Sequence, residues 1–366
     1  MTARFVFAGS SMRVLVAVGA LVMSACADEL VAPLFHPAAP QPMSGTIDSV
    51  GVALDDLQPV ERLGPPYPII LVHGFSGFSE AGPVAYFFEV KDDLETLGND
   101  VTSPALPPVS SSAERARVLA TVVDAVLART QKAKVHIIAH SQGGIDARVL
   151  VGGMGYGPFV ASVTTISTPH FGTAIAELAG IAPEGVLNPA GSFLAWLLGA
   201  AEGEPPSQAD WASDATSDAW TPALQAAFTE LTADSAAQLR ADHPMPAGVP
   251  FFTVAGVTNL RSLDSVDCAA GLWPRLDTVD DVDPFLLATG TVLSFTDGGT
   301  VGNPTANDGL VTVRSARAPD STFLGCVPAD HADEIGQFGD FGAGILSDFD
   351  HRQLYENIVA HIRTVE

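Results

Sequence analysis

One short stretch restricts the possible folds of this chain more than any other. Residues 134–144 read KVHIIAHSQGG, in which a mostly apolar run leads to a serine with a small residue two positions before it and paired glycines beginning two positions after it. A buried strand that turns sharply into a helix needs small residues beside the turn, because strand and helix crowd each other there. The stretch therefore predicts a strand at 135–139, a tight turn at Ser141 and a helix over 143–151.

Apolar runs and amphipathic segments alternate on both sides of this stretch. A continuous apolar run, which is typical of a strand buried on both faces, occurs at 68–72, and further strands are expected at 160–166 and 249–254. Helical patterns cover 84–97 and 112–130. Strands that alternate with helices form parallel βαβ units, so we predict an α/β fold whose mostly parallel sheet is flanked by helices.

Residues 173–247 interrupt this alternation. They contain two amphipathic segments, 191–200 and 218–231, which are separated by polar sequence with prolines. An insertion over one end of the sheet explains the break, and such an insertion is either a plain helical cap or a lid over a site. We predict a lid.

The first 26 residues have the pattern of a targeting segment. Two arginines precede an apolar run at 14–25, which is too short to cross a bilayer as a mature helix. The run ends in the letters MSAC, which resemble a bacterial lipoprotein box with Cys26 as the lipidated residue; ordinary cleavage after Ala27 is the alternative. Both interpretations predict export, either as an anchored lipoprotein of the outer membrane or cell surface or as a secreted protein. Residues 27–66 are rich in Pro, Ala and Asp and are predicted to be a loosely packed lead-in.

The net charge limits the classes of partner, and the cysteine count predicts a disulfide. The 17 Lys and Arg residues against 42 Asp and Glu give a net charge of −25, so nucleic acid is not expected as a partner. Some acidic residues are candidates for calcium binding, with a solvated surface as the alternative. If Cys26 is lipidated or removed, Cys268 and Cys326 remain, and an even pair in an oxidising compartment predicts one disulfide.

The context of Ser141 is that of a nucleophile. The usual pattern at such a turn is G-x-S-x-G, and Ala139 takes the first glycine position as the next smallest residue. The N–H of Gln142, at the start of the predicted helix, would face an oxyanion. The N–H of Phe75, which follows the turn at Gly74, is the candidate for a second donor.

A serine nucleophile needs a base, and the base needs an acid that orients it. In this kind of fold the acid and then the histidine follow the serine along the chain. His331 in PADHADEIGQ and His351 in SDFDHRQLY are the two candidate bases, whereas His170 in STPHFGT is expected to line the pocket. Asp308 lies in a turn, NDGLV, but composition alone does not choose among the acidic residues.

Five stretches, in order over roughly residues 67–366, resemble the bacterial true-lipase family: PIILVHG, AHSQGG, SVTTISTPHFG, ANDGLV and HADEIGQ. These are secreted, calcium-containing triacylglycerol lipases with the α/β-hydrolase fold. The resemblance implies that Ser141 is the nucleophile, Asp308 the acid and His331 the base. It also implies that the Phe75 and Gln142 amides form the oxyanion hole.

The resemblance further implies a structural calcium ion near the catalytic histidine. Asp333 would ligate it through the carboxylate, and Gln337 and Phe341 through main-chain carbonyls. Asp283 in VDDVDPF is the best match to the remaining carboxylate, with Asp280 as the rival. Oxygen ligands of this kind suit Ca²⁺.

The chain departs from the family pattern at several points. Ala139 replaces a glycine, and Arg314 stands where the family's second cysteine follows ANDGLV, so the predicted disulfide is placed differently. The acidic lead-in with its candidate lipid anchor puts dependence on a membrane-bound folding chaperone in doubt.

These features predict a carboxylic ester hydrolase, in first place a triacylglycerol lipase acting on long-chain acylglycerols at a lipid–water interface. Large apolar side chains at 191–200 favour this substrate class, because they can shield a pocket or face lipid. The alternatives are a carboxylesterase acting on short soluble esters or polyesters, and an acyltransferase with the same triad.

Overall fold

The computed structural model describes residues 62–75, 77, 80–81, 84–181, 226–260, 268, 282–283, 286–301, 303–337 and 349–366. All of them belong to one compact unit, Val60–Glu366. The predicted targeting segment with Cys26, most of the lead-in, the segment 191–200, Asp280 and Phe341 lie outside the described residues. Within the described ranges, no helix has both the length and the apolar character needed to span a bilayer.

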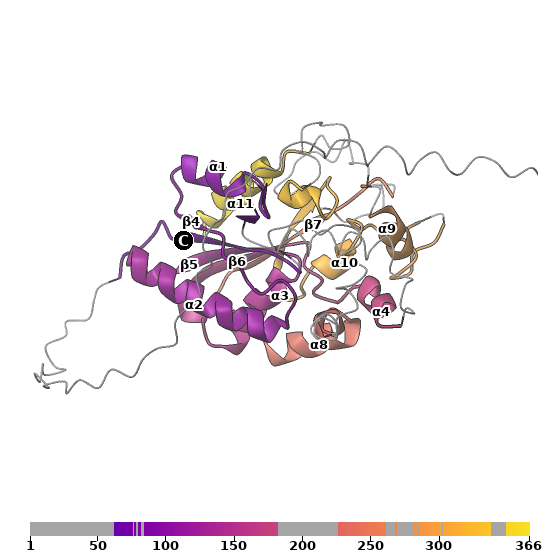
Figure 1. Ribbon diagram of the computed structural model, residues 1–366, viewed down its shortest axis with the longest axis horizontal. Coiled ribbons are helices and arrows are strands. Elements are labelled where there is room, and N and C mark those ends of the chain that lie inside the picture. The colour runs from indigo at the N-terminus through magenta and orange to yellow at the C-terminus, as the bar shows by residue number, and fades with distance from the viewer. Residues whose placement is uncertain are drawn as a thin grey trace, which may run out of the picture. The chain divides into compact units, whose positions relative to one another are not determined.

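A six-stranded sheet in which all neighbours are parallel forms the centre of this unit (Figure 1). In spatial order the strands are β4 Val101–Thr102, β1 Ile69–Val72, β5 Val135–His140, β6 Val160–Ile166, β7 Phe251–Gly256 and β8 Thr322–Val327. Every residue of β1, β5, β6 and β7 is buried. The continuous apolar runs of the sequence are therefore central strands that are covered on both faces, as predicted.

Helices cover the two faces of the sheet (Figure 1). The α-helices of the described residues are α1 Val90–Thr96, α2 Ser112–Thr130, α3 Gly143–Arg148, α4 Ala174–Ile181, α8 Ala233–Asp242, α9 Leu287–Leu293, α10 Val313–Ala316 and α11 His351–Ile362. One core cluster joins the sheet to α1 and α11, and another joins it to α2 and the segment after α3. Shorter elements are the hairpin of β2 Glu80–Ala81 and β3 Val84–Ala85, the π-helix η2 Val149–Gly153 and the 3₁₀ helices η3 Gly157–Phe159 and η5 Asp333–Ile335.

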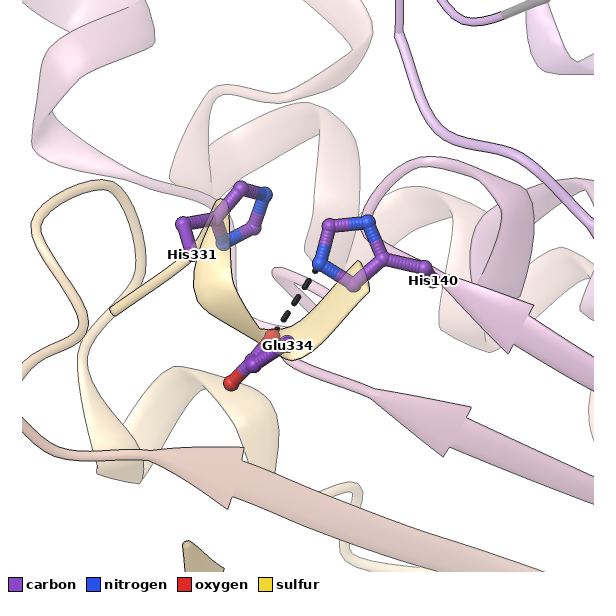
Figure 2. A group of neighbouring side chains, drawn as sticks. All are labelled: His140, His331 and Glu334. Atoms are coloured by element: carbon purple, nitrogen blue, oxygen red, sulfur yellow. Dashed lines mark hydrogen bonds and ion pairs between the residues drawn. The ribbon is translucent and has the colours of Figure 1, made fainter. Parts of the chain in front are cut away.

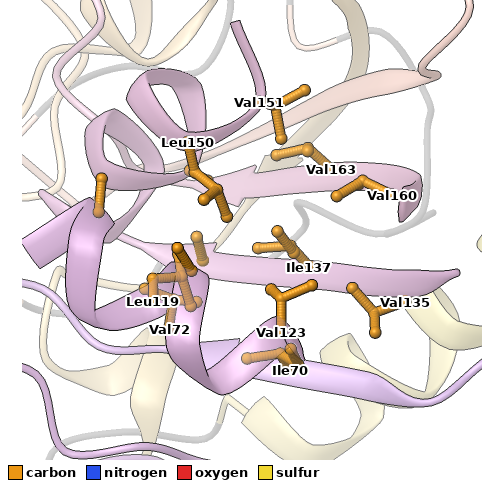
Figure 3. Packing of buried hydrophobic residues seen from close by; sticks show 14 of the residues in the cluster. Ile70, Val72, Leu119, Val123, Val135, Ile137, Leu150, Val151, Val160 and Val163 are labelled. Atoms are coloured by element: carbon orange, nitrogen blue, oxygen red, sulfur yellow. The ribbon is translucent and has the colours of Figure 1, made fainter. Parts of the chain in front are cut away.

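Helix α2 shows why the sequence pattern is reliable where a long amphipathic helix packs on the sheet. Ser111 caps its first turn, because the Ser111 hydroxyl accepts a hydrogen bond from the Glu114 N–H. Leu119 and Val123 are completely buried against Ile137 and the rest of this core cluster (Figure 3). Each such side chain contributes about 1.5–3 kcal/mol through removal from water.

Two expected helices differ from the structure. The pattern at 84–97 predicts one helix, but β3 occupies its start and α1 begins only at Val90. Tyr86 and Phe87 are buried in the loop between them, so tertiary packing of the two rings overrides the local helical pattern. The predicted helix at 143–151 is α-helical only as far as α3 and continues as the π-helix η2. Of the predicted insertion, α4, residues 226–230 and α8 are described and helical, and 182–225 lie outside the described residues.

Candidate active site

Ser141 occupies a strained corner between β5 and α3. Its φ of 55° is left-handed, a conformation that side chains other than glycine adopt at a cost. The corner is held because the Ser141 N–H donates to the Ile166 carbonyl at 2.9 Å and the Thr168 hydroxyl donates to the Ser141 carbonyl at 2.7 Å. The first residue of α3 must be Gly143, since a Cβ there would lie 2.5 Å from the Val72 carbonyl oxygen. This is the strand–turn–helix geometry of a nucleophile elbow.

Ala139 fits this elbow without distortion. It is completely buried in β5, paired with Val72 on one side and Thr165 on the other. A methyl group is therefore accommodated at the position where the usual motif has glycine.

His331 and Asp308 form a buried pair next to the elbow. The His331 Nδ1 lies 2.7 Å from the Asp308 Oδ2, and the His331 N–H donates to the Asp308 carbonyl at 2.9 Å. The other carboxylate oxygen, Oδ1, accepts the N–H groups of Leu310 at 2.8 Å and Val311 at 2.6 Å. Since a carboxylate only accepts, His331 donates through Nδ1, and its Nε2 is left as the basic nitrogen.

The position of His331 places this pair next to the turn that carries Ser141. Its ring centroid is 4.4 Å from that of His140, the residue directly before Ser141 (Figure 2). His351, the alternative base, lies at the start of α11, where its Nε2–H donates to the Phe88 carbonyl at 2.9 Å. The described contacts therefore match the predicted acid with His331, not with His351.

His170 does not meet the expectation that it lines a pocket. Its ring is completely buried, with Nε2 2.9 Å from the Thr165 hydroxyl and an edge-on contact to Phe251. Burial lowers the pKa of His170 well below its usual value, and the nearby Arg148 charge lowers it further. The residue is thus a neutral core histidine between strands and helices.

The loop that carries Phe75 approaches the nucleophile closely. A Cβ on Gly74 would lie 2.6 Å from the Ser141 Cβ and 3.1 Å from its Oγ, so only glycine fits there. The Phe75 ring packs on Phe228 at a centroid distance of 5.3 Å. Among the described residues the Gln142 N–H, the second predicted oxyanion donor, donates to no protein group.

A buried ion pair that sequence reasoning missed holds this loop in place. Arg115 of α2 donates to the Asp146 carboxylate of α3 at 2.7 Å and to the His73 carbonyl at 2.6 Å, and both charged side chains are fully buried. Burial raises the pKa of Asp146 to about 6, against the opposing effect of Arg115. The available signal is that Arg115 lies on the same face of its predicted helix as Leu119, where an apolar residue is expected.

Three buried carboxylates meet beside the His331 loop. One oxygen each from Asp283, Asp330 and Asp333 lies within 4.8 Å of the others. Asp330 accepts the N–H groups of Asp333 at 3.0 Å and Asp283 at 2.9 Å, and burial followed by the charge of Asp283 raises its pKa to about 7. The structure thus brings together two predicted ligands and adds Asp330, which the sequence reasoning did not single out.

This donor set fits the calcium ion that the resemblance implies. Like charges at such short range in a buried place are unfavourable unless a cation or protons neutralise them, and hard oxygen donors select Ca²⁺. Gln337 follows Asp333 by four residues, and its side-chain amide donates to the carbonyls of Ala85 at 2.7 Å and Tyr86 at 2.9 Å.

The structure joins Cys268 to Cys326, the pair expected from the cysteine count. Cys326 lies on β8, and the bridge spans 58 residues. On the chain-entropy model, a disulfide that closes a loop of this size stabilises the folded state by about 4 kcal/mol.

Comparison with known proteins agrees with this geometry. A triacylglycerol lipase of Vibrio cholerae is 36% identical over 123 residues, which are 33% of this chain and 39% of that enzyme. Another, from Pseudarthrobacter phenanthrenivorans, is 40% identical over 116 residues, 30% of this chain and 35% of the relative. About a third of the chain is thus similar in sequence to bacterial triacylglycerol lipases. The matched segment spans well under half of the length of these lipases, and no protein-family model matches the chain.

The fold comparison covers more of the molecule. The lipase of Staphylococcus hyicus superposes with a TM-score of 0.57 at 19% identity, over 83% of this chain and 98% of that enzyme. Together with the parallel sheet, this confirms the predicted α/β-hydrolase fold.

Proposed function

We propose that the chain is a serine hydrolase of carboxylic esters, and that it acts as a triacylglycerol lipase on long-chain acylglycerols. The observation that carries the proposal is the Asp308–His331 pair beside the left-handed Ser141. The names of the similar bacterial lipases support the same substrate class.

The chemistry follows from these three side chains. The Ser141 Oγ attacks the ester carbonyl carbon while the His331 Nε2 takes the hydroxyl proton. The tetrahedral intermediate then expels the alcohol, which leaves with the proton from His331. Water attacks the acyl-enzyme by the same route, and the acid is released as Ser141 regains its proton. Asp308 fixes the imidazole tautomer and stabilises the imidazolium that forms twice in this cycle.

The Phe75 and Gln142 amides are the proposed donors to the oxyanion. The close approach of Gly74 to Ser141 and the N-terminal place of Gln142 on α3 support this role. Removal of one such donor typically costs about 10²–10³ in kcat.

A calcium ion would be held by the carboxylates of Asp283, Asp330 and Asp333 and by main-chain carbonyls of Gln337 and Phe341. Bound there, it supplies positive charge to a buried acidic cluster and takes no part in bond breaking. Its effect on activity is indirect, because Asp330 and Asp333 flank the loop that positions His331.

Export and membrane attachment are the proposed cellular setting. The pattern of residues 14–26 supports cleavage before Cys26 and lipidation of that residue, which would tether the enzyme near lipid. Incorporation of labelled palmitate into the parent but not into a Cys26→Ser variant tests this, and a mature protein without label would indicate plain secretion. Recovery of folded enzyme from a heterologous host with and without a candidate chaperone tests the need for a folding partner.

Labelling with a fluorophosphonate tests the proposed reaction class independently of the natural substrate. We expect stoichiometric modification of Ser141, located by peptide mass spectrometry, and none in a Ser141→Ala variant. Rates with a short soluble ester, a polyester and an emulsified long-chain ester then assign the substrate class. Formation of a new ester in the presence of an added alcohol, in preference to free acid, would indicate an acyltransferase.

A further inference from the structure

A chain of buried hydrogen bonds lies beneath the proposed triad without belonging to it. Glu334, on η5, is its centre: Oε2 lies 3.1 Å from the His140 Nε2, and Oε1 accepts the Ser167 hydroxyl at 2.5 Å (Figure 2). At one end the Tyr86 hydroxyl is 2.8 Å from the His140 Nδ1. At the other, the Gly256 N–H donates to the Ser167 oxygen at 3.0 Å.

The chain connects the elements that carry the active site. His140, Ser167 and Gly256 stand at the carboxyl ends of β5, β6 and β7, three neighbouring strands of the sheet. Glu334 follows His331 by three residues, so its side chain anchors the loop on which the base is mounted. These hydrogen bonds are therefore the direct link between the end of the sheet and the His331 loop.

The contact with His331 is immediate. The His140 and His331 rings lie 4.4 Å apart and tilted by 49°, with Glu334 below them (Figure 2). A Cβ at Gly256 would meet the Glu334 Oε1 at 2.2 Å and the Asp308 Cβ at 2.9 Å. Only glycine fits at position 256, between Glu334 and Asp308, and the Glu334 carboxylate lies within 4.8 Å of ring nitrogens of both His140 and His331.

Ser167 shows that this arrangement is held at a cost. Its φ of 45° is left-handed, so glycine would satisfy the backbone better. The hydroxyl is what glycine lacks, and it is used twice, as a donor to Glu334 and as an acceptor from Gly256. The presence of serine at this buried, left-handed position is explained if the two hydrogen bonds of its hydroxyl are needed.

We propose that Ser167, Glu334 and His140 are positioning residues that fix the His331 ring relative to Ser141. The inference rests on the proposed ester hydrolysis and adds residues to it. These side chains hand no proton to the substrate; they restrict the rotation and translation of the base. Because catalysis depends on placement of the reacting groups to within about 1 Å, loosening the ring lowers kcat and leaves substrate binding intact.

Substitution of Ser167 by glycine separates positioning from folding. Ser167→Gly removes the hydroxymethyl group and with it two buried hydrogen bonds, but it also relieves the backbone strain, which offsets part of that loss; melting curves verify that the variant is folded. We expect kcat for a soluble p-nitrophenyl ester to fall by about tenfold to a hundredfold with an unchanged KM. The rate of Ser141 inactivation by a fluorophosphonate should fall in proportion. Gln131→Gly is the matched control, because Gln131 is also left-handed, at φ 58°, but is exposed at the end of α2.

A second pair of variants tests the hydrogen bonds at Glu334. Glu334→Leu keeps the volume and removes the bonds, whereas in Glu334→Gln the amide oxygen still accepts from Ser167 and the amide nitrogen can donate to His140. We expect the Gln variant to retain about tenfold more kcat than the Leu variant. Equal losses in the two, or a Ser167→Gly variant with parental kcat, would overturn the inference. If the parent itself neither hydrolyses esters nor reacts with the fluorophosphonate, the proposed function fails instead.

Discussion

Replacement of Asp308 by asparagine should abolish catalysis through the tautomer of His331. The Asp308 Oδ1 accepts two main-chain N–H groups, from Leu310 at 2.8 Å and Val311 at 2.6 Å. Only the amide oxygen of an asparagine can accept those bonds, so the amide nitrogen must take the position of Oδ2, 2.7 Å from the His331 Nδ1. Nδ1 then has to accept, and the proton moves to Nε2, which can no longer take a proton from Ser141.

The expected loss is about 10⁴ in kcat, the size known for this change in a serine protease triad. At 1.36 kcal/mol per factor of ten, that is about 5.4 kcal/mol of transition-state stabilisation. The assay is kcat on a soluble p-nitrophenyl ester, normalised to the concentration of active sites, with melting curves to verify folding. Asp297→Asn is the control, since Asp297 is exposed and its carboxylate accepts the Thr312 hydroxyl at 3.0 Å, and this change should alter kcat by less than about twofold. A folded Asp308→Asn enzyme with more than a tenth of the parental kcat would refute the assignment of the acid.

Three further outcomes follow from the same structure. Calcium at one hundred times its Kd stabilises by about 2.7 kcal/mol, so a chelator should lower the melting temperature by about 4 °C. An unchanged melting curve would contradict the site. Gly74→Ala puts a methyl group 2.6 Å from the Ser141 Cβ and should lower kcat about 10²-fold, whereas Gly64→Ala, which meets no atom within 4 Å, should be neutral in the same assay. Arg115→Ala leaves the Asp146 carboxylate buried without its ion-pair partner and should lower the free energy of unfolding, measured by urea denaturation, by about 3–5 kcal/mol. A loss below about 1 kcal/mol would argue against a stabilising role of the Arg115–Asp146 ion pair.

The strands and the tight turn at Ser141 were predictable because their signals are local. A run such as 68–72 is apolar throughout because both faces of the strand are covered, and the small residues after Ser141 follow from crowding at one turn. The same holds for α2, whose cap at Ser111 and apolar face lie within a few residues of each other.

The acid and the base needed more than local pattern. Composition left many acidic residues open, and only the resemblance of ANDGLV and HADEIGQ to lipase motifs selected Asp308 and His331. The structure supplies the reason. Asp308 and His331 lie 23 residues apart in sequence, so the hydrogen bond between their side chains depends on how the chain returns over the sheet.

Features that depend on distant packing were missed. Arg115 and Asp146 are 31 residues apart, and although the place of Arg115 on the apolar face of its helix indicates a buried charge, the local sequence does not identify Asp146 as its partner. Asp330 is next to His331, but its place among the carboxylates depends on a turn that brings Asp283 to it. The helix expected at 84–97 starts late because the Tyr86 side chain is buried and its hydroxyl forms a hydrogen bond with His140, a residue 54 positions further along the chain.

The central claim is that Ser141 hydrolyses long-chain acylglycerols with His331 and Asp308. Its most direct test is the release of fatty acid from an emulsified long-chain triglyceride by the purified protein, beside the Ser141→Ala variant. We predict steady release by the parent and none by the variant, with Ala139 as a working substitute for the glycine of the elbow. Release by both proteins, or by neither although the parent is folded and supplied with calcium, would contradict the claim.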